Sequence, residues 1–104
     1  MGTAMIRFDP GKIVMTPSAM EAMASARQRP SDFLHRHISG DWGELDAHDA
    51  RANEAAMTSG LRLLSSYKTA DGKILWIITE AIDLQAGDDP AERALTTLLL
   101  PSDY

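Results

Sequence analysis

Residues 61–80 have the sequence LRLLSSYKTADGKILWIITE, and this stretch decides the fold. Two strand-like runs, 61–67 and 73–80, flank a short connection that contains Asp71-Gly72. Asp-Gly within such a connection favours a tight turn between antiparallel strands. We therefore predict a β-hairpin over residues 61–80.

The second run of this hairpin is apolar on both faces. In a strand, Ile74, Trp76 and Ile78 point to one face, and Leu75 and Ile77 to the other. A strand that is apolar on both faces is typical of a sheet interior, so we expect this strand to be central and Trp76 to lie in the core. Residues 95–100, rich in Thr and Leu, predict a third strand.

The N-terminal half carries helix signals. The first helix lies within residues 16–29 and begins either at Thr16, with Pro17 in the first turn, or at Ser18, with Glu21 completing a capping box. Pro30 ends it. A second helix is predicted over residues 32–39 with Ser31 as its cap.

A third helix is predicted over residues 47–59, between the N-cap Asp46 and Gly60. Its small residues predict a face for close packing, formed by Ala52, Ala55, Ala56 and Ser59. Near the N-terminus, residues 6–8 and 12–15 flank a turn at Asp9-Pro10-Gly11, and they form either a small hairpin or one edge strand.

Helices and strands therefore fall in separate runs, which indicates an α+β fold. We expect a small antiparallel sheet of three to five strands, packed with about three helices from the N-terminal half, in one domain over residues 1–104. Residues 81–94 have few apolar anchors and predict a mobile acidic loop. Gly87 and Pro90 disfavour regular structure in this loop, and its acidic residues are Asp83, Asp88, Asp89 and Glu92.

The composition of the chain excludes several kinds of site and several classes of function. The chain has 104 residues, a formal net charge of −5 and no cysteine, which excludes disulfides, thiolate metal sites and cysteine nucleophiles. The longest apolar stretch, residues 74–78, is far shorter than the ~18 residues of a membrane span, and residues 1–10 show no signal-peptide run. We expect a cytoplasmic protein without a membrane or direct nucleic-acid role, whose partner is a protein with a basic surface.

Catalytic and cofactor motifs are not evident. His35 and His37 are two residues apart, so on a helix they point in different directions, and His48 lies in no metal-binding motif. No serine lies in a G-x-S-x-G elbow, and no glycine-rich phosphate loop occurs. We therefore predict a non-enzymatic protein with no metal and no other cofactor.

The segment HISGDWG, residues 37–43, is the densest cluster of specific residue types. Two interpretations remain open: a binding corner with Trp42 as its anchor, or a helix-to-helix turn whose Trp42 fills the core. Four acids gather around this corner without a basic residue between 40 and 50, and the predicted binding residues are Asp41, Trp42, Glu44, Asp46 and Asp49. The alternative function is a small enzyme or ligand-binding domain that uses the Gly40–Gly43 corner with His37 or His48.

Five features together resemble a family of small bacterial proteins called plasmid-related or hypothetical, some of which carry the label of a type I restriction modification subunit. They are HISGDWG at 37–43, Asp49 with Asn53, GLRLLSSY at 60–67, WIITE at 76–80 and TTLLLPSDY at 96–104. The resemblance covers residues 30–104, and residues 81–94 are longer than the family's usual link.

A modification activity does not fit these residues, because the chain is too short for a methyl-donor sheet and contains no Pro-Pro for a base-flipping motif. The resemblance implies a mobile genetic element, and such elements often carry small acidic inhibitors of host restriction or CRISPR systems. We therefore expect an accessory protein that acts by protein–protein binding, with anti-CRISPR or anti-restriction activity as its concrete form.

Overall fold

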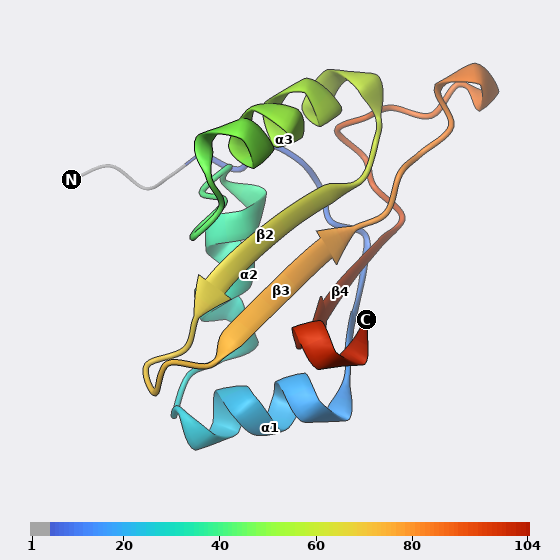
Figure 1. The fold of residues 1–104 in the computed structure, drawn as a ribbon. Coiled ribbons are helices and arrows are strands. Elements are labelled where there is room, and N and C mark those ends of the chain that lie inside the picture. The colour runs from blue at the N-terminus through green and yellow to red at the C-terminus, as the bar shows by residue number, and fades with distance from the viewer. Residues whose placement is uncertain (1–4) are drawn as a thin grey trace.

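A computed structural model describes residues 5–104 of the chain. Three helices, α1 (Pro17–Ser25), α2 (Pro30–Ile38) and α3 (Ala47–Ser59), come from the N-terminal half. Four strands form one sheet: β1 (Lys12–Met15), β2 (Leu63–Lys68), β3 (Ile74–Thr79) and β4 (Leu95–Leu99). Two single 3₁₀ turns, η1 (Leu84–Ala86) and η2 (Pro101–Asp103), complete the molecule (Figure 1). The predicted α+β class is confirmed.

The strands lie in the order β1-β4-β3-β2. β2 and β3 pair antiparallel from Leu63 opposite Thr79 to Lys68 opposite Ile74, so the predicted hairpin and its interior second strand are confirmed. β4 pairs antiparallel with the other side of β3. Of the two interpretations of the N-terminal segment, the edge strand forms. Because β1 lies parallel to β4, the sheet is mixed rather than purely antiparallel as we predicted.

All three helices pack against the same face of the sheet, which we call the inner face. The main core joins α1 and α2 to β2, β3 and β4 through Ala19, Met23, Phe33, Tyr67, Leu75, Ile77 and Leu98. A second, smaller cluster joins α3 to the start of β2 through Phe8, Trp42, Ala56 and Leu63. Figure 1 shows α2 behind the sheet and η2 in front of it.

The outer face of the sheet is covered only in part. The ring of Trp76 is half-buried and meets Tyr104 edge-on, with 6.0 Å between ring centroids, while Tyr104 itself is 70% exposed. Our expectation that Trp76 lies in the core is therefore wrong. Its strand is apolar on both faces because the C-terminal turn, rather than a helix layer, shields the outer one.

The ends of the helices agree with the capping signals in the sequence better than their buried faces agree with the predicted ones. Thr16 caps α1, with its hydroxyl oxygen accepting from the Ala19 N–H at 3.1 Å, and Asp46 caps α3 as predicted. α2 begins at Pro30, two residues before the predicted start, because the Asp32 carboxylate accepts from the Arg29 N–H at 2.8 Å.

The face that α3 turns inward differs from the predicted one. Asn53 and Ala56 are buried, whereas Ala52, Ala55 and Ser59 are exposed. The Asn53 amide donates to the Leu64 carbonyl at 2.6 Å and accepts from the Leu64 N–H at 3.1 Å. A side chain thus satisfies the backbone of β2 where a further strand would otherwise pair.

The segment 81–94 contains η1 and no strand, and one arginine fixes its end. Arg93 is only 4% exposed, and its guanidinium donates to four backbone carbonyl groups, those of Ala56, Leu61, Glu80 and Pro90, at 2.6 to 3.2 Å. Ala56 lies in the last turn of α3, where exposed carbonyl groups favour a cation. The mobility of the rest of this segment stays a prediction.

Candidate functional site

The segment after α2 is fixed to the free edge of β2. Gly43 forms a parallel bridge with Ser66: the Glu44 N–H donates to the Ser66 carbonyl at 2.6 Å, and the Ser66 N–H donates to the Trp42 carbonyl at 3.2 Å. Gly43 has φ +76°, and a Cβ there would collide with the Ser66 carbonyl oxygen. Only glycine fits this approach, so the predicted corner is a rigid attachment of the α2–α3 connection to the sheet.

Trp42 is part of the interior. Its side chain belongs to the cluster with Phe8, is 6% exposed, and donates from Nε1 to the Glu54 carboxylate at 2.9 Å. The second of our two interpretations therefore describes this residue. An indole with this burial offers almost no contact area, so the predicted role of Trp42 as an exposed binding anchor is wrong, and its ring fills the space beneath the turn.

Asp41 has a cation beside it. The Arg36 Nε donates to its carboxylate at 2.7 Å, the Gly43 N–H donates to it at 3.1 Å, and the Arg36 guanidinium lies 4.6 Å from the Tyr67 ring centroid. The Arg36 hydrogen bond holds the pKa of Asp41 below its usual value. Asp41 therefore shapes the turn, and its charge is largely matched.

The other three carboxylates are exposed. Glu44 lies 3.9 Å from the Lys68 ammonium group. Asp46 accepts from the Asp49 N–H at 2.8 Å as the cap of α3. Four acids thus meet two cations, Arg36 and Lys68, that lie outside residues 40–50, and the local charge is smaller than the sequence of the corner indicates.

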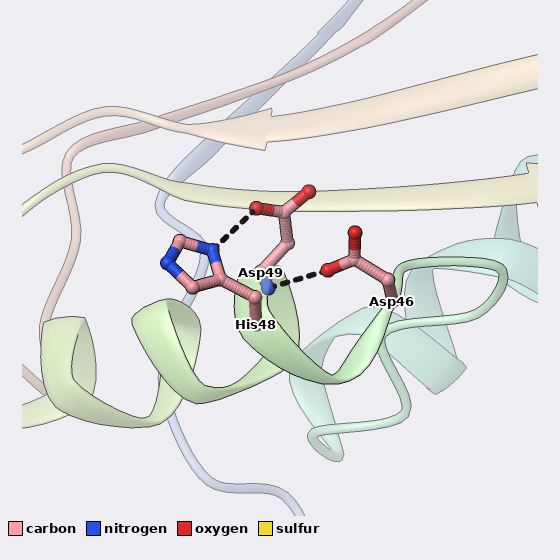
Figure 2. A group of neighbouring side chains, drawn as sticks. All are labelled: Asp46, His48 and Asp49. Carbon is pink, nitrogen blue, oxygen red and sulfur yellow. Dashed lines mark hydrogen bonds and ion pairs between the residues drawn. The ribbon is translucent and has the colours of Figure 1, made fainter.

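Asp46, His48 and Asp49 lie together at the start of α3, as Figure 2 shows. One potential ligand atom of each falls within 4.8 Å of the others, and the His48 Nδ1 lies 3.4 Å from the Asp49 carboxylate. All three are exposed, and one carboxylate oxygen of Asp46 already accepts a helix N–H. The positive end of the helix dipole opposes a cation here, so we interpret the group as a helix cap.

His37, the histidine of the alternative function, is fully buried. Its Nδ1 lies 2.5 Å from the Ser65 hydroxyl and its Nε2 lies 2.8 Å from the Thr79 hydroxyl. The rings of Phe8 and Trp42 meet it edge-on, and burial lowers the pKa of His37 to about 3. Within residues 5–104 no pocket opens. Both ring nitrogens are occupied, so this geometry gives a catalytic His37 no support.

The chain matches no protein-family model, no curated protein and no solved structure. Among residues 5–104, no helix combines the length and the apolar character needed to cross a membrane.

Proposed function

We propose that this protein acts by binding a partner protein with a basic surface, through the exposed carboxylates of Glu44, Asp46 and Asp49. The observation that carries the proposal is the attachment of residues 42–44 to β2 by two backbone hydrogen bonds. This attachment and the helix cap hold the three acids on a rigid base. Binding groups that are already ordered lose less conformational entropy on association.

The charges of this surface favour a basic partner. Exposed like charges on one side of a molecule steer an oppositely charged partner and raise the association rate. Asp41 and Trp42 contribute indirectly, by holding Arg36 and filling the space beneath the turn. The interaction should therefore weaken as added salt screens the charges.

The family resemblance supports a more specific partner class. Small acidic proteins of mobile elements commonly act on host restriction or CRISPR systems, whose nucleic-acid grooves carry many basic side chains. Carboxylates on a rigid surface offer such a groove a substitute for phosphates. We therefore propose an anti-restriction or anti-CRISPR role, exerted by protein binding without catalysis.

Charge reversal at two positions tests the proposal. Glu44 and Asp49 are the right choices, because Asp41 holds Arg36 and Asp46 caps α3. The variant Glu44→Lys/Asp49→Lys should lose about 1 kcal/mol of stability or less per site, since exposed charges contribute little. It should no longer capture a partner from lysate of the source cell at low salt.

The matched control is Glu21→Lys/Glu92→Lys, which changes the net charge equally. Both glutamates are exposed, and neither carboxylate accepts a hydrogen bond within residues 5–104. The control should keep the partner, and mass spectrometry should identify the same protein as with the unmodified chain. Retention of that partner by the folded Glu44/Asp49 variant would contradict the proposal, and so would its loss from both variants.

A further inference from the structure

A chain of hydrogen bonds crosses the interior from β2 to the N-terminal segment. It joins the Ser65 hydroxyl, both ring nitrogens of His37, the hydroxyls of Thr79 and Thr96, and the Pro10 carbonyl. The two threonine oxygens are 2.7 Å apart, and Thr96 lies 2.9 Å from the Pro10 oxygen. The four side chains are fully buried and belong to α2, β2, β3 and β4.

The Pro10 carbonyl at the end of this chain fixes which group donates and which accepts in each hydrogen bond. A carbonyl oxygen can only accept, so the Thr96 hydroxyl donates its hydrogen to the Pro10 carbonyl and accepts from the Thr79 hydroxyl. Thr79 has then used its own hydrogen and accepts from His37 Nε2. The His37 ring therefore carries its proton on Nε2, and Nδ1 accepts from the Ser65 hydroxyl.

We infer that His37 is a neutral Nε2–H imidazole in a one-way hydrogen-bond chain that fastens α2 and the Trp42 segment to the sheet, and that acid releases this fastening by shifting the equilibrium toward the unfolded chain, in which His37 is free to take up a proton. A second proton would turn Nδ1 into a donor. Ser65 would then have to accept from it and find another acceptor for its own hydrogen. The same step would place a positive charge against Phe8 and Trp42, whose rings pack on the imidazole.

The charged and titratable side chains around His37 do not offset that charge. On α2, Arg36 is bonded to Asp41 and lies over Tyr67 of β2. On α3, Glu54 is bonded to Arg7 and to Trp42. Asp9 accepts from the Gly11 N–H. Within the described residues, the imidazole itself bonds only to the two hydroxyls, and burial is what lowers the pKa of His37.

Acid lowers the stability of the fold because His37 takes up a proton more readily in the unfolded chain than in the folded one. Above pH 6.5 the imidazole is neutral in the folded and in the unfolded chain and adds no pH dependence. Between pH 6.5 and about 3, only the unfolded chain takes up the proton. The ratio of folded to unfolded protein therefore falls about tenfold per pH unit from this residue, or roughly 100-fold at pH 4.5.

Nitrogen NMR of the histidine rings tests the tautomer directly. At pH 7, His37 should show a protonated Nε2 and an unprotonated Nδ1, and its signals should not titrate down to pH 5 while the protein stays folded. The exposed rings of His35 and His48 serve as references in the same spectrum. A proton on Nδ1, or protonation of His37 above pH 5 in the folded protein, would overturn the inference.

Urea unfolding at pH 7 and pH 4.5 tests the acid release. Between pH 7 and pH 4.5, the ratio of folded to unfolded protein should fall roughly 100-fold further in the unmodified chain than in His37→Gln. The exposed control His35→Gln should behave like the unmodified chain. In a Trp76→Phe background, the remaining fluorescence of Trp42 reports the release. Equal acid sensitivity of His37→Gln and His35→Gln would refute the release, and the NMR experiment decides the tautomer even if His37→Gln does not fold.

Discussion

Replacement of Asn53 should open the edge of β2. The buried amide makes two hydrogen bonds with the backbone of Leu64, each worth about 1 kcal/mol net, and their loss leaves an N–H and a C=O without a protein partner. Water can reach part of this edge, because Leu64 is half-buried. We therefore expect Asn53→Ala to cost about 2–3 kcal/mol of unfolding free energy. Urea unfolding at pH 7 measures it, with an unchanged m-value showing that the folded state is retained.

Asn53→Asp gives a sharper test, because it keeps the shape of the side chain. The carboxylate can still accept from the Leu64 N–H, but it turns an oxygen toward the Leu64 carbonyl, where the amide donated. Its deficit relative to the unmodified chain should shrink as the pH falls, since a protonated carboxyl can donate again. The control Thr58→Ala, on the exposed side of α3, should stay within about 0.5 kcal/mol. A cost below 1 kcal/mol for Asn53→Ala would refute the argument that this amide closes the edge.

Four other predictions concern stability, order and metal. Arg93→Met should cost about 2–4 kcal/mol in urea unfolding, because four carbonyl groups lose a charged donor, and Arg93→Lys should recover part of this. Trp76→Ala should cost less than the 3–5 kcal/mol typical of a core tryptophan, about 1–2 kcal/mol by the same method, because its ring is half-buried. Limited proteolysis should cut first within residues 83–89, and a first cut inside α3 would contradict this. A chelator should leave the melting temperature unchanged, whereas a shift of several degrees would assign a metal to the protein.

Local signals in the sequence determined much of this fold. Asp71-Gly72 and the two strand-like runs beside it specify the β2–β3 hairpin, and Asp46 with Gly60 sets both ends of α3. These features depend on neighbours a few residues apart. The pairing of β1 with β4 depends on residues at opposite ends of the chain, and no local pattern distinguishes it from a short hairpin.

The candidate site was predicted only in outline for the same reason. The acids around residues 41–49 were visible in the sequence, but the cations beside them, Arg36 and Lys68, lie on α2 and at the end of β2. An arginine in an acidic loop is expected to be solvated, yet Arg93 is buried against the end of α3. Trp42 was compatible with an exposed and with a buried position, and only the three-dimensional contacts decided between them.

The parallel pairing of β1 with β4 has a consequence for the order in which the chain assembles. About five residues separate the hairpin strands, whereas about 80 residues separate β1 from β4. Closing the longer loop costs roughly 2 kcal/mol more in chain entropy, so β1 should join the sheet after β2, β3 and β4 have paired. Until then β4 presents an open edge, and β1 from another molecule can occupy it. Refolding at high protein concentration should therefore produce dimers with exchanged N-terminal strands.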